Sequence, residues 1–106
     1  MRSTITEDHQ LDAEGRPAGG TTTGRGFLIC WQDGPLAVDG VRQEPKGAFV
    51  EDVIAAAVGR LEHYQAGRFR CRENALAITK LQEALDWLDV RTRAREARGV
   101  EGTHEV

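Results

Sequence analysis

Residues 68–103 read RFRCRENALAITKLQEALDWLDVRTRAREARGVEGT, and this stretch decides the fold. Its apolar residues recur at steps of three and four, which is the spacing of one core-facing helix stripe. They are Ile78, Leu81, Leu85 and Leu88. The stretch predicts one long helix of about seven turns that opens near residues 72–74. Gly99 marks its predicted end, because glycine readily takes the left-handed conformation that follows a helix.

A second helix is predicted directly before this one, from Phe49 to Gln65, with Gly67 ending it. Glu51 and Asp52 fall in its first turn, where acidic side chains suit the helix dipole. The residues expected to face the core are Phe49, Val53, Ile54, Ala57, Val58 and Leu61. Only the run RFRCR separates the two helices, and so short a connection forces them to lie antiparallel as a helical hairpin.

The part of the chain before the helices predicts a β-hairpin. Residues 25–32 are bulky and β-prone, and the run DGP at 33–35 is a strong turn signal before a short return strand at 36–41. Residues 1–23 are polar and show no apolar periodicity, so we expect a flexible N-terminal arm.

The expected fold class is therefore α+β. A chain of 106 residues with 40% hydrophobic content is one small domain, which we expect at 24–106. Within it, 24–44 is expected to form the β-hairpin, and 48–106 the helical hairpin and a tail. Domains of this size often gain stability by forming oligomers.

Composition narrows the class of partner. The net charge is −3 and the sequence pI about 5.6, which argues against a protein that binds nucleic acid in bulk. Cys30 and Cys71 stand far apart without neighbouring histidines, so neither a zinc site nor a disulfide framework is indicated. No apolar run approaches the length of a membrane span or a secretory signal, and we expect a cytosolic protein.

The sequence shows no convincing catalytic set, and a binding protein is favoured over an enzyme. The most suggestive charges are arginines near the end of the long helix, of which Arg91 and Arg95 lie four positions apart and so on one side. Two guanidinium groups placed this way suit one phosphorylated ligand. The alternative is that these cations only complement the negative end of the helix dipole.

Asn74 lies 17 positions before Arg91, or about 25 Å along the helix at 1.5 Å per residue. One small ligand cannot touch both in a single chain. Tyr64 is expected beside Asn74, so two copies packed antiparallel would bring Tyr64 and Asn74 of one to Arg91 and Arg95 of the other. An aromatic ring, an amide and two guanidinium groups suit a nucleotide. The alternatives are that Tyr64 is a core aromatic and Asn74 a helix-capping residue.

The runs RLEHYQAGRFRCRENALAITKLQEALDWL at 60–88 and RTRAREARGVEGTH at 91–104 closely resemble the helical-hairpin domain of two groups of phage anti-defence sponges. One group is Thoeris anti-defence protein one, and the other is the anti-CBASS sponge. The run GFLICWQDGP at 26–35 resembles the β-hairpin of the Thoeris group, whereas the loop at 41–47 differs from the connection typical of that group.

The resemblance implies a non-catalytic phage protein in the cytoplasm of the infected bacterial host. It would sequester cyclic ADP-ribose isomers (glyco-cyclic ADP-ribose) made by TIR-domain enzymes, need no cofactor or metal, and bind at the subunit interfaces of a homodimer or homohexamer. Matching motifs position by position implies that the ligand-binding residues are Tyr64, Asn74, Arg91 and Arg95. Further ligand-binding candidates are Arg72, Glu101 and Thr103.

Three rival functions stay open at this point. The chain could bind the cyclic di- or trinucleotides of CBASS, at additional sites or in place of the main ligand. It could degrade the signal as an enzyme. It could also be a small nucleic-acid-binding helical hairpin that uses the arginines at 91–98.

Overall fold

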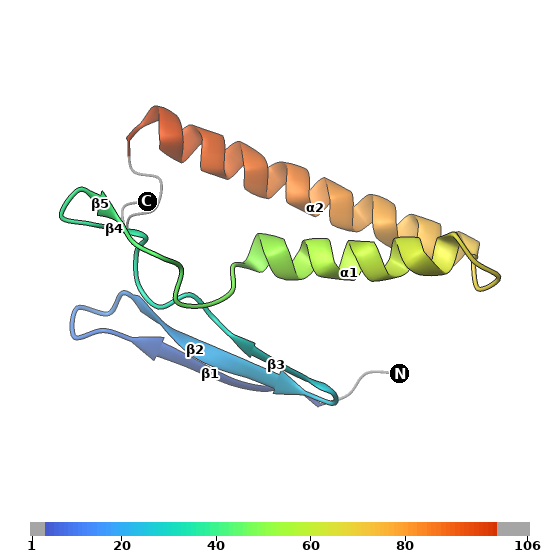
Figure 1. The fold of residues 1–106 in the computed structure, drawn as a ribbon, viewed down its shortest axis with the longest axis horizontal. Coiled ribbons are helices and arrows are strands. Elements are labelled where there is room, and N and C mark those ends of the chain that lie inside the picture. Colours follow the sequence, from blue (N-terminus) through green and yellow to red (C-terminus); the bar gives the residue numbers. More distant parts are fainter. Residues whose placement is uncertain (1–3, 100–106) are drawn as a thin grey trace. The chain divides into compact units, whose positions relative to one another are not determined.

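The structure is a computed structural model that describes residues 4–99 of the 106-residue chain. It divides into two compact units, one ending at Phe49 and the other beginning at Val50. Among the described residues, the first unit holds the strands and the second the helices (Figure 1). The elements are β1 (Thr6–Leu11), β2 (Pro17–Gly24), β3 (Phe27–Cys30), β4 (Ala37–Val38), β5 (Val41–Arg42), α1 (Val50–Gln65) and α2 (Arg72–Ala97). The expected α+β class is confirmed.

The main sheet of the first unit is antiparallel and has three strands in the order β1-β2-β3. β3 pairs with β2, from Thr21 opposite Cys30 to Gly24 opposite Phe27, so the expected pairing of 25–32 with 36–41 is wrong. Strands also occupy much of residues 1–23, where the sequence pattern predicted none. The reason lies in the second half of β2, which is the run Thr21–Thr23, because threonine is a β-branched residue that favours strands without creating an apolar pattern. The division into an arm and a domain at residue 24 remains a prediction.

Aromatic residues at and after β3 pack against β2. Thr22 is buried, and the indole Nε1 of Trp31 donates a hydrogen bond to its Oγ1 at 2.7 Å. Gly24 lies opposite Phe27, and the Phe27 ring fills the space that a Cβ at Gly24 would need. The polar strand therefore gains its packing from Phe27 and Trp31, which lie further along the chain.

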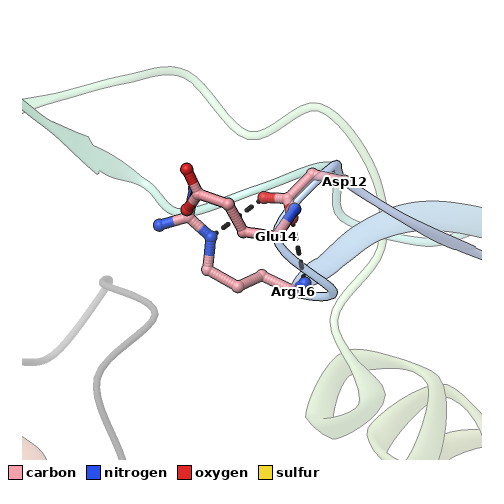
Figure 2. Close-up of polar contacts among 3 residues, drawn as sticks. All are labelled: Asp12, Glu14 and Arg16. Carbon is pink, nitrogen blue, oxygen red and sulfur yellow. Dashed lines mark hydrogen bonds and ion pairs between the residues drawn. The ribbon is translucent and has the colours of Figure 1, made fainter.

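Asp12 organises the turn between β1 and β2 (Figure 2). Its Oδ1 accepts hydrogen bonds from the backbone N–H groups of Glu14 at 2.9 Å and Arg16 at 3.0 Å, and its Oδ2 accepts from the Arg16 Nε at 3.0 Å. Arg16 Nη2 also pairs with Glu14 at 2.6 Å. The backbone hydrogen bond from Arg16 is the largest influence that lowers the pKa of the Asp12 carboxyl below its ordinary value. The ionised carboxylate therefore stabilises this turn.

The small pair β4–β5 replaces the expected return strand. Asp39 and Gly40 join its strands with φ angles of 52° and 77°, and two positive φ values in succession are typical of a type I′ hairpin turn. In the earlier Asp33–Gly34 pair, Gly34 has a positive φ and Asp33 does not. The second Asp-Gly pair, not the first, makes the hairpin.

The two helices match their predicted positions closely. α1 and α2 are joined by residues 66–71 and lie side by side in opposite directions (Figure 1). The Sγ of Cys71 accepts a hydrogen bond from the Asn74 backbone N–H at 3.4 Å, so Cys71 and not Asn74 caps α2. At the other end, Gly99 follows the last turn with a φ of 75°, which confirms the predicted stop.

The facing stripes of α1 and α2 form the contact between the helices. Among the residues whose side chains the structure describes, Val58 is the one buried apolar side chain, and Ala57 is exposed, contrary to prediction. The other expected core residues are half-buried, namely Phe49, Val53, Ile54, Leu61, Ile78, Leu81, Leu85 and Leu88. A second stripe of α2, formed by Leu76, Trp87 and Val90, is 46%, 68% and 48% exposed.

Candidate functional site

Tyr64 lies in the last turn of α1 and is half-buried, held by a neighbour that the sequence pattern did not reveal. The Nε of Arg60 donates a hydrogen bond to the Tyr64 Oη at 3.1 Å, and its guanidinium carbon lies 5.0 Å from the ring centroid. This distance is within the range of a cation–π contact. The spacing of four positions on one helix is the signal that could have found the pair.

Asn74 lies in the first turn of α2, across the connection from Tyr64, and is half-buried. Its side-chain Nδ2 donates to the backbone oxygen of Phe69 at 3.4 Å. The amide nitrogen therefore contacts the connection, whereas the side-chain oxygen accepts no hydrogen bond from residues 4–99. Tyr64 and Asn74 lie at the same end of the helical hairpin, as the sequence predicted.

Gln65 links the end of α1 that carries Tyr64 to the start of α2 that carries Asn74, through hydrogen bonds to Cys71. Its Nε2 donates to the backbone oxygen of Cys71 at 3.0 Å, and its Oε1 accepts from the Cys71 backbone N–H at 2.9 Å. The residue after Tyr64 is thus joined to the residue that caps the Asn74 N–H. No sequence pattern had assigned Gln65 a role.

The second group of predicted residues lies near the other end of α2. Arg91 is exposed and Arg95 is half-buried. Between them, Arg93 pairs through Nη2 with Oδ2 of Asp89 at 2.9 Å on the outside of the helix. Of the three, Arg91 and Arg95 share a side, as predicted from their spacing.

Arg95 also continues the inner stripe of α2. Asn74, Leu81, Leu88 and Arg95 stand seven positions apart in series, and all four are half-buried. Seven positions are close to two helical turns, so these residues follow one line along the helix. The core-facing line thus begins with the amide of Asn74 and finishes with the guanidinium of Arg95.

Helix length explains why the arginine end is not covered by α1. α1 has 16 residues and α2 has 26, a difference of about 15 Å at 1.5 Å per residue. Because the helices are joined at the Tyr64–Asn74 end, the excess length lies at the Arg91–Arg95 end (Figure 1). A single chain does not bring the two groups together.

Three further residues were predicted to bind the ligand, namely Arg72, Glu101 and Thr103. Arg72 is the first residue of α2 and is exposed beside the connection. Glu101 and Thr103 lie outside the described residues. Between residues 4 and 99, no three His, Cys, Asp or Glu side chains gather in a group that could hold a metal ion. Within the same range, no helix is long and apolar enough to span a bilayer.

The two antiparallel helices joined by residues 66–71 form a helical hairpin, which is the fold of a known domain family. A model of the Acb2/Tad1 hairpin domain matches residues 32–93, and the chain belongs to this family. Over 82 residues it is 50% identical to a protein named Thoeris anti-defense 1 from Bacillus phage SBSphiJ7. That match covers 77% of this chain and 55% of the relative, so the chain spans about half the length of the relative. The family predicted from the sequence is confirmed.

Proposed function

We propose that this protein is a non-catalytic sponge that binds glyco-cyclic ADP-ribose and related cyclic ADP-ribose isomers made by TIR-domain enzymes. By sequestering the signal, it would keep the Thoeris effector inactive during phage infection. The observation that carries the proposal is the 50% identity over 82 residues to a Thoeris anti-defense 1 protein. The geometry of the candidate residues supports it.

Each candidate residue suits one part of such a ligand. The Tyr64 ring offers a flat surface on which a base can stack, and the guanidinium carbon of Arg60 lies 5.0 Å from the ring centroid. The side-chain oxygen of Asn74 can accept from a base or ribose donor. Arg91 and Arg95 can donate charge-assisted hydrogen bonds to a pyrophosphate.

The site would be complete only between two copies. Asn74 and Arg91 are about 25 Å apart along α2, too far for one small ligand. Antiparallel packing of two α2 helices would place the arginine end of each against the Tyr64–Asn74 end of the other, giving two equivalent pockets.

Isothermal titration of the purified chain with glyco-cyclic ADP-ribose tests the proposal. Wild-type chain should bind saturably, and Arg91→Ala should weaken binding about 10- to 150-fold, because a charge-assisted hydrogen bond contributes about 1.5–3 kcal/mol. Arg93→Ala is the matched control, since this guanidinium pairs with Asp89 at 2.9 Å on the same helix. Equal affinity of Arg91→Ala and wild type would refute the assigned role of Arg91.

Further measurements separate the rival functions. Heating the complex should release unaltered ligand, and release of a cleaved product would identify an enzyme. Cyclic di- and trinucleotides titrated in the same way should bind more weakly or at separate sites without displacing the first ligand. Tight duplex binding with a steep salt dependence would instead identify a nucleic-acid-binding hairpin.

A further inference from the structure

The side-chain amide of Gln65 makes two hydrogen bonds to the backbone of one residue, Cys71, across the connection. Its amide donates to the Cys71 oxygen at 3.0 Å and accepts from the Cys71 N–H at 2.9 Å. Both distances are typical of good hydrogen bonds. The two bonds close residues 66–70 into a small loop whose ends are fixed to each other.

The backbone conformation of Cys71 allows it to make both hydrogen bonds with Gln65. Its φ of −158° and ψ of 165° are extended, so its N–H and C=O both point sideways from the chain, as in a strand. Its N–H precedes the helical hydrogen bonds of α2 and depends on Gln65 for a partner. Its Sγ then accepts from the Asn74 N–H at 3.4 Å.

A continuous set of contacts thus runs from Tyr64 to Asn74. Gln65 follows Tyr64 in the last turn of α1 and holds Cys71, and Cys71 caps the turn that carries Asn74. Asn74 closes the set by donating from Nδ2 to the Phe69 oxygen at 3.4 Å. The connection contains Gly67, which gives the backbone freedom that these contacts remove.

We infer that Gln65 is a positioning residue, which sets the place of Asn74 relative to Tyr64 and thereby the affinity of the pocket. The inference rests on the proposed function and adds to it a residue that need not touch the ligand. Pre-arranging two binding groups raises affinity because less ordering remains for the ligand to impose.

Two substitutions of Gln65 distinguish the hydrogen bond that it donates from the one that it accepts. Gln65→Ala removes both hydrogen bonds. Gln65→Glu keeps the acceptor for the Cys71 N–H at neutral pH but places a carboxylate oxygen against the Cys71 carbonyl, and it regains a donor when protonated near pH 4.3, the ordinary glutamate pKa. Gln82→Ala and Gln82→Glu are matched controls on the exposed surface of α2.

The two readouts are amide hydrogen exchange at Cys71 and titration with glyco-cyclic ADP-ribose. Gln65→Ala should lose protection at the Cys71 N–H and bind about tenfold more weakly, the equivalent of about 1.4 kcal/mol. Gln65→Glu should keep that protection, bind more weakly than wild type at pH 7, and recover relative to wild type at pH 4. Both Gln82 variants should behave as wild type.

Wild-type affinity in Gln65→Ala, with protection at Cys71 lost, would overturn the positioning role. If Gln65→Ala does not fold, Gln65→Glu decides alone: equal affinity to wild type at pH 7, or a deficit that does not change at pH 4, overturns it. Failure of the wild-type chain to bind would instead overturn the proposed function.

Discussion

Mixing two defective variants gives a quantitative test of the shared pocket. Asn74→Ala removes the amide at one end of α2, and Arg91→Ala removes a guanidinium at the other, about 25 Å away. In a two-fold dimer, each pocket would take Tyr64 and Asn74 from one chain and Arg91 and Arg95 from the other. A dimer of either variant alone therefore has one defect in each pocket.

A mixed dimer concentrates both defects in one pocket and leaves the other intact. When equal amounts are unfolded together and refolded, about half of the dimers are mixed, and one of their two pockets is complete. About a quarter of all pockets should therefore bind glyco-cyclic ADP-ribose with wild-type affinity. Isothermal titration reports this as a tight-binding phase with about a quarter of the wild-type stoichiometry.

The matched control mixes Asn74→Ala with Tyr64→Ala, whose defects lie at the same end of the hairpin. Every pocket of such a mixed dimer carries a defect, so no tight-binding phase should appear. The shared pocket is refuted if the Asn74→Ala and Arg91→Ala mixture shows no recovery, or if both mixtures recover equally.

Trp87, Tyr64 and Asp12 each give a further test. We expect the outer stripe of α2, where Trp87 is 68% exposed, to contact a second copy, so Trp87→Glu should lower the mass measured by light scattering while helix content by circular dichroism is kept. Gln82→Glu on another face is the control, and an unchanged mass for Trp87→Glu would contradict this expectation. Tyr64→Phe loses the 3.1 Å hydrogen bond from Arg60 but keeps the ring, so its affinity for glyco-cyclic ADP-ribose should change less than about threefold in the titration. A large loss of affinity would instead assign a binding role to the hydroxyl. Because the folded-state pKa of Asp12 is lowered, its carboxylate stabilises the fold above the ordinary pKa, and this contribution is lost as pH falls through the lowered value. Thermal unfolding should therefore show that Asp12→Asn is less stable than wild type at neutral pH and that the difference in stability shrinks in acid. A difference that does not depend on pH would contradict this.

The helices could be predicted from the sequence because their signals are periodic and local. Leu81 and Leu88 mark the inner stripe, and Gly99 has the positive φ on which its predicted role depends. The cap was assigned less well, because a cysteine thiol is a weak acceptor and Cys71 is not among the residues that usually cap helices.

The sheet could not be predicted by the same means. Thr22 is buried through a hydrogen bond from Trp31, nine positions later, and such a partner leaves no mark in an apolar pattern. The choice between two Asp-Gly turns depends on which strands find partners, and the Thr-rich β2 supplied a better partner for β3 than residues 36–41 did.

The candidate site was predicted in part. Its spacing along α2 follows from helix geometry, but the contacts of Arg60 with Tyr64 and of Gln65 with Cys71 depend on side-chain conformations that spacing alone does not specify. Whether Tyr64, Asn74, Arg91 and Arg95 bind the ligand stays a prediction.

A pocket shared between chains requires that no isolated chain binds. Light scattering of the purified protein at the concentration of the titration, with and without glyco-cyclic ADP-ribose, tests this most directly. The binding-competent species should have the mass of at least two chains. A species with the mass of one chain that captures the ligand with full affinity would contradict the shared pocket.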